Sequence, residues 1–557
     1  MKVVAQLASN SGSYLAIDAG GTRIRGYESL TATEFTGSGV THTNSLALDL
    51  ARNISDAIPH GINEVDTLVL SLAAIPQKAE DQKLLAAALL QRLRFEKLVI
   101  ASDTKAAALS SKSQADLTIA VGTGITALVH MPNHNFELTG HGYLIGDEAS
   151  GFWVGRSGLN AALRADEGRG PDTSLLKAAI DFYQVPAKEL ADHIHQLATP
   201  VAQVAAFAPC VVKAAASGDA EALFIISQAA NEISVLIEVA IERANIKTVA
   251  LVGGAIPHGE LLHKQVLTAS QSLDIDFITD SAEPLQGARK IAENTNLQSD
   301  LIAFSSSSIE SEIWSKLYLL SAQELLGRVA ITQRESVAAC VKLFTDALAS
   351  GKMIHTFGTG HSHLLAEEIF YRAGGLAAIY PILDERLMLH KEVVKGSQNE
   401  RLPGLAQELI NQHPIASGDV VIVISNSGGN QVTIDLVKLA QGLGAKVIAV
   451  TSVNHATSSA ARSSASEKIH QLADVVLDNS GVVGDALIRV AGSPMSAGPT
   501  STVIGGALLQ SVVVGTVAEC LKRGIQPEIF LSSNLAGGDE NNAAIFDKYR
   551  SLIDLYN

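Results

Sequence analysis

Three glycine turns in the first half of the chain each follow an apolar, β-compatible stretch. They are Asp18-Ala19-Gly20-Gly21-Thr22, Gly122-Thr123-Gly124 and Gly253-Gly254-Ala255. Glycine lets the chain turn tightly, so backbone N–H groups and a threonine hydroxyl can face an anion, and Asp18 beside a polyphosphate can hold Mg²⁺. Taken alone, the first turn also fits an ordinary hairpin. The three turns together predict a nucleotide site between two lobes.

Asp103 lies between the first two turns, just past the apolar stretch Lys97–Ala101 and at the start of a predicted helix. A carboxylate in that position can cap the helix. It can also accept the proton of an attacking sugar hydroxyl, the role that phosphoryl transfer commonly gives to one positioned carboxylate. The residues alone leave both roles open.

Two further glycine-containing loops follow apolar stretches in the second half. Lys352–Phe357 runs into Gly358-Thr359-Gly360-His361-Ser362-His363, and Val420–Ile424 runs into Ser425-Asn426-Ser427-Gly428-Gly429-Asn430. Each loop precedes a predicted helix, whose N-terminal N–H groups and dipole attract anions. Loops at the carboxyl ends of parallel strands are expected to share one crevice. Their hydroxyls and amides suit a phosphate monoester.

Proton transfer in an aldose–ketose isomerase, a deaminase or an etherase needs an acid and a base near that crevice. The candidates are Glu367, Glu368, His361, His363 and His390. Any one of them can instead lie on a solvated helix face or cap a helix. His361 and His363 could also pair on a metal, although the sequence offers no matched third ligand.

Short apolar strands that alternate with Ala- and Leu-rich helical stretches must position these groups. The alternation is typical of α/β domains, in which helices cross between parallel strands. In the first half, strands are expected at Tyr14–Asp18, Thr22–Tyr27, Thr67–Leu72, Lys97–Ala101, Leu117–Val121 and Thr248–Val252. In the second half, they are expected at Lys352–Phe357, Val420–Ile424 and Lys446–Thr451.

A chain of 557 residues is too long for one hydrophobic core. The α/β pattern lapses at residues 294–311, where polar residues include the serine run Ser305–Ser308. We therefore expect a first domain over residues 1–293, a linker over 294–311 and a second domain over 312–557. Val503–Cys520 is apolar enough to suggest a membrane span, but its polar residues favour a buried core helix.

The composition favours small-molecule partners in a reducing compartment. A formal net charge of −16 argues against a nucleic-acid or anionic-membrane surface. Cys210, Cys340 and Cys520 are too far apart for a disulfide framework or a zinc motif. The apolar stretch at the N-terminus is too short for a signal peptide or a membrane span, so we expect a cytoplasmic protein.

The first half resembles the BadF/BadG/BcrA/BcrD ATPase family, and especially its N-acetylglucosamine kinase branch. The segment Gly142-Tyr143-Leu144-Ile145-Gly146-Asp147-Glu148-Ala149-Ser150-Gly151-Phe152-Trp153-Val154-Gly155 is similar to the branch signature G-x-x-x-G-D-E-G-S-x-x-W-I-G. Glu283-Pro284-Leu285-Gln286-Gly287-Ala288 resembles the closing P-x-x-G-A segment of the family. The resemblance implies the two-lobed fold of actin and hexokinase, with ATP and Mg²⁺ as cofactors.

The same resemblance implies a role for each matched residue. Asp18 would serve the metal and the phosphates, and Asp103 would be the catalytic base. The phosphate-binding residues would be Gly20, Gly21, Thr22, Gly122, Thr123 and Gly124, with Gly253 and Gly254 at the adenosine. Asn44 and Asp147 match positions that bind the sugar in aminosugar kinases.

This sequence departs from the family pattern in two ways. Ala19 and Ala149 stand where the family often has glycine, and Arg23 stands where it often has lysine. These changes remove no catalytic group but can alter loop shape and substrate preference. An ATPase that activates a partner enzyme is the alternative to a kinase, and the lack of a cysteine cluster for an iron–sulfur centre weighs against it.

The second half, from about residue 312, resembles the sugar isomerase (SIS) domain, with a doubly wound parallel sheet. The similar segments are Gly358–Glu368, Phe370–Gly375, Ser425–Gly428, Val483–Ala486, Gly498–Thr502 and Asn534–Asn541. The resemblance implies that Ser362, Ser425 and Ser427 hold phosphate, and it compares Glu368 with the helix glutamate of phosphoheptose isomerases. Asn430 occupies a position where many SIS domains have threonine, which leaves the fourth phosphate contact open.

The sequence as a whole favours a two-part sugar enzyme. The first half is expected to phosphorylate an aminosugar with ATP and Mg²⁺, and the second to bind the phosphosugar. The second half could isomerise, deaminate or cleave that product, or could act only as a sensor of it. SIS domains commonly pair across a twofold axis, so a homodimer is expected.

Overall fold

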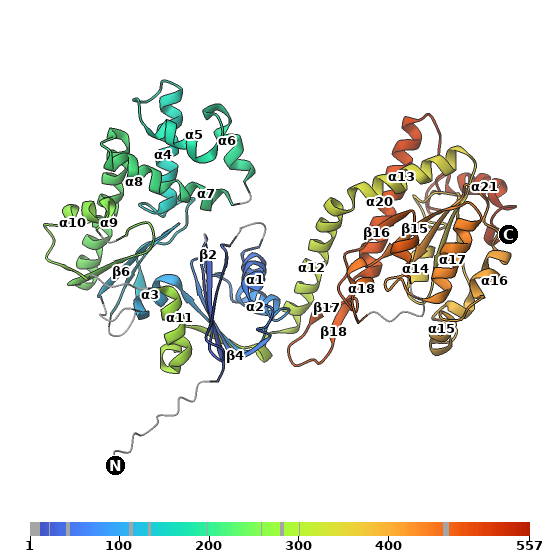
Figure 1. Ribbon diagram of the computed structural model, residues 1–557, viewed down its shortest axis with the longest axis horizontal. Coiled ribbons are helices and arrows are strands. Elements are labelled where there is room, and N and C mark those ends of the chain that lie inside the picture. The colour runs from blue at the N-terminus through green and yellow to red at the C-terminus, as the bar shows by residue number, and fades with distance from the viewer. Residues whose placement is uncertain are drawn as a thin grey trace, which may run out of the picture. The chain divides into compact units, whose positions relative to one another are not determined.

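The chain forms two compact units, residues 1–313 and 314–557, in a computed structural model (Figure 1). The structure describes residues 12–21, 23–40, 45–110, 115–131, 135–197, 199–257, 259–278, 283–299, 301–460 and 467–556. Strands and helices alternate through both units, so the predicted α/β class is confirmed.

The first unit contains two sheets of the same design. The strands of its first sheet are β1 (Tyr14–Ala19), β2 (Arg23–Glu28), β3 (Thr33–Ser38), β4 (Glu64–Leu72), β5 (Arg94–Ser102) and β11 (Ile302–Ser305). β1, β2 and β3 form an antiparallel meander, and β4 and β5 extend the sheet parallel to β1. β1 is buried along its whole length, as expected of a central strand covered on both faces.

The second sheet repeats this arrangement. Its strands are β6 (Leu117–Val121), β7 (Ile125–Val129), β8 (Phe136–Glu137), β9 (Thr248–Val252) and β10 (Asp276–Ile278). β6, β7 and β8 again form a meander, and β9 and β10 again add parallel strands beside the first strand. The duplicated design confirms the two-lobed, actin-like architecture predicted from the family resemblance.

Helices connect and cover the two sheets. They are α1 (Leu46–Ala57), α2 (Ala79–Leu89), α3 (Asp103–Ser110), α4 (Gly151–Asp166), α5 (Leu175–Tyr183), α6 (Ala187–Gln196), α7 (Pro200–Ala206), α8 (Ala208–Ala216), α9 (Ala220–Ala244), α10 (Leu261–Ala269) and α11 (Pro284–Glu293). Helices α4 to α9 are inserted between the meander of the second sheet and β9, and they bury a large apolar core against it. α3 and α11 pack against each other beside the first sheet.

The segment 294–311 differs from the expected linker. It forms two 3₁₀ turns, Thr295–Gln298 and Ser306–Ser308, and the strand β11 between them pairs antiparallel with β5 at the edge of the first sheet. An edge strand exposes alternate residues, which can therefore be polar, and this polar composition resembles that of a linker. Regular structure therefore continues up to α12 (Ser311–Thr332), in which the first unit ends.

The second unit is built on one parallel sheet. Its strands are β12 (Ile354–Gly358), β13 (Ile379–Ile382), β14 (Val420–Ile424), β15 (Lys446–Thr451) and β16 (Val475–Asp478). They lie in the order β13-β12-β14-β15-β16, and every neighbouring pair is parallel. The strand order reverses between β12 and β14, and ligands of such sheets bind at that switch point. The predicted doubly wound parallel sheet is confirmed.

Helices cover the sheet of the second unit, and a small hairpin follows the last strand of that sheet in the chain. The helices are α12, α13 (Arg334–Ala349), α14 (Ser362–Glu368), α15 (Val393–Asn399), α16 (Leu405–Gln412), α17 (Gln431–Gly442), α18 (Val453–Thr457), α19 (Ile469–Leu472), α20 (Ser501–Lys522) and α21 (Gly538–Tyr549), with 3₁₀ turns at Glu385–Leu387 and Asp554–Tyr556. The hairpin pairs β17 (Ala486–Arg489) with β18 (Ser496–Pro499).

Two helices, α9 and α20, are long and apolar enough to cross a membrane. Buried core helices pass the same test of length and hydropathy. The residues Ile504, Leu508, Leu509, Val512 and Val513 of α20 lie in a hydrophobic core of the second unit, and α13 packs along this helix (Figure 1). The helix predicted at Val503–Cys520 is therefore present and buried along one face.

Candidate functional site

Asp18 lies near the carboxyl end of β1, just before the first glycine turn. Its carboxylate is almost fully buried and accepts hydrogen bonds from Arg25 Nη2 at 2.8 Å and Ser71 Oγ at 3.1 Å. Burial raises the pKa of Asp18, and the Arg25 guanidinium opposes this shift. The group is therefore an anchored anion in the cleft of the first unit.

Asp103 is the first residue of α3, directly after β5. Ser102 Oγ accepts the N–H of Lys105 at 3.2 Å and so caps the helix, whereas the Asp103 carboxylate accepts the N–H and the hydroxyl of its neighbour Thr104. Burial, with the negative charge of Asp18 as the next cause, raises the pKa of Asp103 to about 6. Ser102 thus performs the capping role, which leaves Asp103 available for chemistry.

A second carboxylate lies close to Asp103 and adds to the rise of its pKa that burial causes. Asp18 is the largest electrostatic cause of the shift, and Glu137 at the end of β8 adds to it. Two carboxylates close together favour a cation between them, and Mg²⁺ is commonly held by one or two carboxylates together with substrate phosphates. Within the described ranges, no three His, Cys, Asp or Glu side chains form a metal cluster. The residues fit a metal shared with a ligand.

The P-x-x-G-A segment explains how α3 is held. A Cβ on Gly287 would lie 1.7 Å from the carbonyl oxygen of Ala106, so only glycine lets α11 pack directly on the backbone of α3. Pro284 begins α11, and Ala288 is fully buried in the same contact region. This signature therefore positions the helix that carries Asp103.

The second glycine turn joins β6 to β7 and faces the first turn. Gly122 N–H donates to the Gly124 carbonyl at 2.8 Å, and the N–H groups of Gly151 and Phe152, at the start of α4, donate to the carbonyls of Gly122 and Thr123. A Cβ on Gly21 would lie 3.8 Å from the Thr123 side chain, which is contact distance. The turns of the two lobes therefore meet across one cleft.

The third glycine turn follows β9. Gly253 has φ +112°, and a Cβ there would lie 2.3 Å from the carbonyl oxygen of Val121. No other residue type fits this close approach of the two strands. The turn thus lies beside the second one, as a nucleotide site requires.

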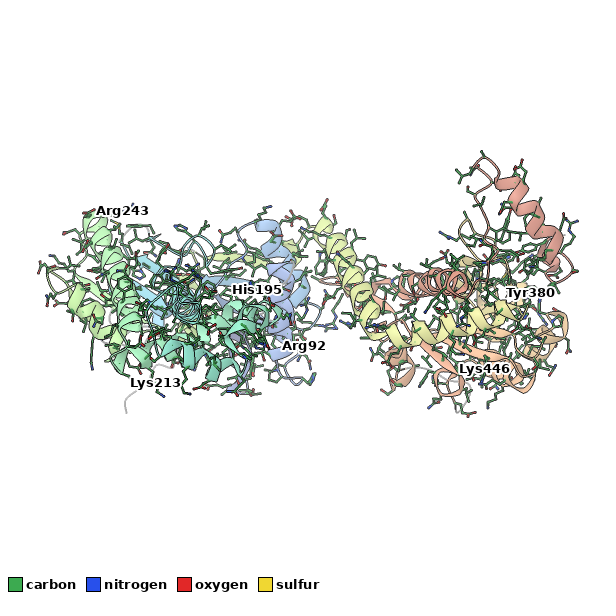
Figure 2. The ribbon with its side chains drawn as sticks, turned by 90° about the horizontal axis from the view of Figure 1, so that it is seen from above. Arg92, His195, Lys213, Arg243, Tyr380 and Lys446 are labelled. Carbon is green, nitrogen blue, oxygen red and sulfur yellow. The ribbon has the colours of Figure 1, made fainter. Side chains whose placement is uncertain are left out.

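A cavity of about 940 Å³ opens beside the second and third turns. Helices α7, α8 and α10 form its other walls with mostly apolar side chains and two lysines, Lys213 on α8 (labelled in Figure 2) and Lys264 on α10. The lining residues are Gly122, Thr123, Gly151, Ala205, Ala206, Ala208, Pro209, Val212, Lys213, Ala216, Gly254, Ala255, Pro257, Gly259, Glu260, Leu261 and Lys264. An apolar wall with a few polar groups suits a flat heterocycle.

Asp147 lies in the loop before α4 with φ +60°. Its carboxylate accepts the Gly142 N–H at 3.1 Å, and a Cβ on Gly124 would lie 2.7 Å from Asp147 Oδ2, so the side chain reaches the second turn. Burial raises the pKa of Asp147. Ala149 also has positive φ, +71°, which explains why the family often has glycine there.

Two predicted ligands, Thr22 and Asn44, lie outside the described residues. Of the other predicted residues of the first unit, Asp18 and Asp103 lie close to each other, and Gly21 lies at contact distance from the second turn. Gly253, Gly254 and Asp147 adjoin that turn from the third turn and from the loop before α4.

The two predicted loops of the second unit begin at the same edge of the sheet, at neighbouring positions in the strand register. Gly358 pairs with Ile424 in the parallel ladder of β12 and β14, so the loops at 358–362 and 425–430 leave neighbouring strands at the switch point of the sheet. Gly360 and Gly428 have φ of +56° and +64°, and both turns depend on glycine. The shared crevice predicted from the sequence follows from this register.

The serines of these loops differ in what they contact. Ser425 is buried, and its Oγ accepts the Gly428 N–H at 3.1 Å, so it shapes its own loop. Within the described part of the chain, the hydroxyls of Ser362 and Ser427 make no hydrogen bond. Lys468 Nζ donates to the Ser427 carbonyl at 3.3 Å, which brings a cation to the same loop.

The amide of Asn430 is directed to a carboxylate. Asn430 Nδ2 donates to Glu400 Oε2 at 2.7 Å, and Glu400 Oε1 lies against the other loop, 3.1 Å from the position of a Cβ on Gly360. Glu400 therefore connects both loops of the crevice. The sequence left open whether Asn430 contacts the phosphate, and in this structure its side-chain amide donates to Glu400.

The predicted acid–base groups are scattered. Glu368 is the last residue of α14, about 9 Å along the helix from Ser362, and it pairs with Arg372 at 2.7 Å. His363 is buried with Nδ1 on the Gly360 carbonyl, whereas His361 and His390 are exposed. His361 and His363 thus belong to the first loop and its helix, whereas Glu368 lies at the far end of that helix.

Several residues of both sites carry no sequence signal that would have identified them. They are Arg25, Ser71, Glu137, Lys213 and Lys264 in the first unit, and Thr359, Glu400 and Lys468 in the second. All but Arg25 and Thr359 reach their site from an element distant in sequence or from a helix position that no motif marks. Only Thr359 stands inside a predicted loop.

Comparison with protein families assigns each unit. The model of the BadF/BadG/BcrA/BcrD ATPase family matches residues 11–288, and the model of the SIS domain matches residues 317–452. A UPF0309 protein of Halalkalibacterium halodurans is 40% identical over 225 residues, which are 40% of this chain and 93% of that protein. A UPF0309 protein of Listeria innocua is 39% identical over 231 residues, 42% of this chain and 94% of its own.

Solved structures give more distant likenesses. A candidate N-acetylglucosamine kinase from Chromobacterium violaceum has 23% identity and a TM-score of 0.40 over 51% of this chain and 99% of its own. A phosphoheptose isomerase from Francisella tularensis has 14% identity and a TM-score of 0.26 over 38% of this chain and 99% of its own. The assignment rests on the family models and the UPF0309 proteins. The chain belongs to the BadF/BadG/BcrA/BcrD ATPase family through residues 11–288 and to the SIS-domain proteins, beside UPF0309, through its second unit.

Proposed function

We propose that the first unit is a sugar kinase that uses ATP and Mg²⁺ to phosphorylate an aminosugar of the glucosamine or N-acetylglucosamine type. The single observation that carries this proposal is the Asp103 carboxyl group, with its pKa near 6, beside Asp18 and the facing glycine turns. A base whose pKa lies near the working pH can both take and release the proton of a hydroxyl.

Each part of the cleft has a task in this reaction. The cavity beside Gly254 would take the adenosine, and the N–H groups of the first two turns would face the phosphates. Asp18 would hold Mg²⁺, which neutralises phosphate charge when bound. Asp103 would accept the proton of the sugar hydroxyl as that oxygen attacks the terminal phosphorus of ATP.

The sugar would bind on the side of Asp147. A buried carboxylate accepts hydrogen bonds from sugar hydroxyls, and an unpaired buried acceptor would cost binding free energy. Asn44 remains a proposed second ligand from the family resemblance. The two would orient one hydroxyl toward Asp103.

The second unit is proposed to bind the sugar phosphate made by the first. The hydroxyls of Ser362 and Ser427 and the N–H groups at the start of α17 would contact the phosphate, with Lys468 close to the Ser427 loop. We further propose that this unit converts the phosphosugar. A homodimer through this unit stays a proposal from the family resemblance.

A substrate screen tests both proposals. Purified protein is incubated with ATP, Mg²⁺ and a panel of hexoses and hexosamines, and ATP consumption and product mass are recorded. We expect a hexosamine phosphate to form. ATP consumption without any phosphorylated sugar would favour an ATPase that acts on a partner. A phosphosugar that binds unchanged but alters the kinase rate would favour a sensor in the second unit.

A further inference from the structure

Glu400 occupies the switch point of the second unit's sheet, although no sequence motif marks it. It follows the last residue of α15 and is half-buried. Its Oε2 accepts the Asn430 amide at 2.7 Å from the loop after β14, and its Oε1 lies 3.1 Å from the position of a Cβ on Gly360, in the loop after β12. Its backbone carbonyl accepts the Val432 N–H at 3.2 Å, near the start of α17. One carboxyl group is thus fixed to both walls of the crevice.

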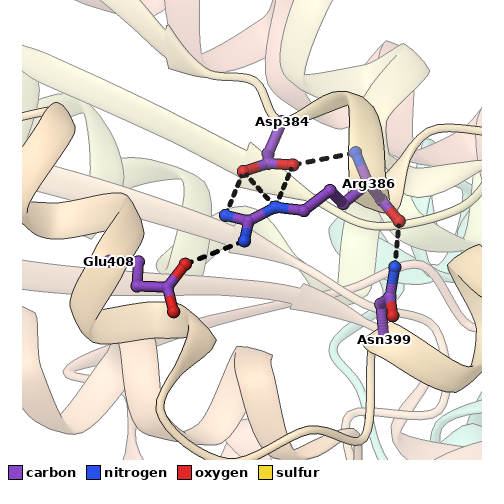
Figure 3. Close-up of polar contacts among 4 residues, drawn as sticks. All are labelled: Asp384, Arg386, Asn399 and Glu408. Atoms are coloured by element: carbon purple, nitrogen blue, oxygen red, sulfur yellow. Dashed lines mark hydrogen bonds and ion pairs between the residues drawn. The ribbon is translucent and has the colours of Figure 1, made fainter.

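A polar network fixes the end of α15, directly before Glu400 (Figure 3). Asn399 Nδ2 donates to the Arg386 carbonyl at 2.9 Å, and the Arg386 guanidinium contacts Asp384 and Glu408 at 2.7 and 2.8 Å. Gly360 N–H, in turn, donates to the Leu387 carbonyl at 3.0 Å. The segment after β13, the end of α15 and the first loop are therefore joined into one rigid wall, as a positioned catalytic group requires.

The surroundings of Glu400 suit a proton carrier. Burial raises its pKa, while the Thr359 hydroxyl, the charge of Arg401 and the Asn430 amide oppose the rise. Glu368, by contrast, is paired with Arg372 and receives Gln510 Nε2 at 3.3 Å on its other oxygen. Of the two glutamates, only Glu400 contacts the loops that would hold the ligand.

We propose that Glu400 is the proton-transfer residue of the second unit and acts on the carbon next to the carbonyl of an open-chain 2-aminohexose 6-phosphate. This inference rests on the proposed conversion of the phosphosugar. The Glu400 carboxylate takes the proton from C2, the C2–H electron pair becomes the C1–C2 double bond, and the carbonyl electron pair moves to O1 and is protonated there. Isomerisation, deamination and elimination of a C3 substituent can all begin with this step.

Asn430 then becomes a positioning residue. Its amide holds Glu400 Oε2 and so orients the carboxylate between the loops. Threonine, common at this position in SIS domains, is too short to hold the carboxylate in this way. The departure from the SIS pattern therefore exchanges a phosphate contact for a support of Glu400.

Deuterium exchange tests the inference without the kinase reaction. The full-length chain, without ATP, is incubated in D₂O with glucosamine 6-phosphate and, separately, N-acetylglucosamine 6-phosphate, and loss of the C2 proton signal is followed by NMR. We expect exchange in the wild type, and Glu400→Gln to slow it by about 100-fold or more, since general bases contribute factors of this size. Calorimetric Kd values for the phosphosugar should stay within about threefold.

Two further variants make the test specific. Glu392→Gln removes a charge at the other end of α15, where Glu392 is exposed and pairs with Lys395, and should exchange at the wild-type rate. Asn430→Ala should slow exchange about tenfold with an unchanged Kd, whereas loss of a phosphate contact would weaken binding instead.

The outcomes separate this inference from the proposed function. If wild-type protein exchanges the C2 proton and Glu400→Gln does so equally fast, Glu400 is not the base, although the conversion stands. If wild-type protein binds the phosphosugars with no exchange, both the conversion and the role of Glu400 are overturned. Glu368→Gln, run in parallel, should leave the exchange rate unchanged. If this variant lost C2 proton exchange, Glu368 would be the base instead of Glu400.

Discussion

The cleft of the first unit and the crevice of the second are built on the same kind of turn, but the groups around the turns differ in charge. In both, a buried strand ends in a glycine turn whose N–H groups can face phosphate. The first unit surrounds its turns with the carboxylates Asp18 and Asp103, whose pKa values are both raised, chiefly by burial. The second surrounds its loops with the hydroxyls of Ser362 and Ser427 and with Lys468.

Because of this difference in charge, the same kind of turn suits two different phosphate ligands. Carboxylates repel a polyphosphate unless a divalent cation lies between them, so the first cleft suits a metal-bound nucleotide. Hydroxyls, a helix N-terminus and a lysine attract a phosphate monoester directly. The first unit should therefore need metal to handle phosphate, and the second should not.

Removal of the metal should have the largest effect, and it should affect the first unit without affecting the second. We expect EDTA to abolish phosphorylation by the full chain, because Asp18 and Asp103 would then repel the nucleotide phosphates. Binding of a hexosamine 6-phosphate by the second unit should keep its Kd within about twofold under the same conditions, measured by titration calorimetry. Metal-dependent phosphosugar binding would contradict the assignment of hydroxyls and Lys468 to that site.

Asp103→Asn should lower kinase turnover by roughly a factor of 10² to 10⁴, the usual contribution of a general base. The amide keeps the shape of the carboxyl group, so sugar affinity should change little. Wild-type turnover should fall as pH drops through about 6, where Asp103 becomes protonated. A pH profile of kcat measures this, and turnover that stays constant below pH 5 would leave Asp103 with a structural role.

Ser362 and Ser427 offer the matched test in the second unit. Changing both to alanine should weaken phosphosugar binding by roughly 10- to 100-fold, since two hydrogen bonds to a charged group are lost. Kinase turnover should be unchanged. Ser425→Ala is expected to act differently, through the shape of its loop, and a thermal melt would detect the loss of its bond to Gly428.

The smallest effect concerns stability. Asp103 has a pKa of about 6 in the folded protein against an ordinary value of 3.8, so the folded state binds this proton more tightly. Its contribution to stability is full below pH 3.8 and is lost as pH rises through 6. Asp103→Asn should therefore stabilise the first unit at pH 7.5 by roughly 1 to 3 kcal/mol. Denaturant unfolding at pH 7.5 and 5 measures this, and equal stabilisation at both values would contradict it.

Local patterns in the sequence were enough to predict much of the fold. β6, β9, β14 and β15 begin and end at the predicted residues, because each is a short apolar run bounded by polar or glycine residues. The serine-rich segment 294–311 failed as a linker because pairing of β11 with β5 depends on a distant strand.

The candidate sites divide along the same line. The glycine turns, Asp18, Asp103 and the serine loops are visible in the sequence, because the physical requirement of a tight turn after a strand is local. Only the structure showed that Ser102, and not Asp103, caps the helix, because Ser102 Oγ accepts the Lys105 N–H. Likewise, only the structure showed that Glu368 forms an ion pair with Arg372.

What the sequence by itself determined was the set of strands, the turns that can face phosphate and the division into two α/β halves. These depend on residue types within a few positions of each other. Only the tertiary structure decided which charged groups share a space: Arg25 and Ser71 on Asp18, Asp18 beside Asp103, and Asn430 on Glu400. The pKa of a carboxyl group and the direction of an amide depend on neighbours brought by distant elements, and no local pattern encodes them.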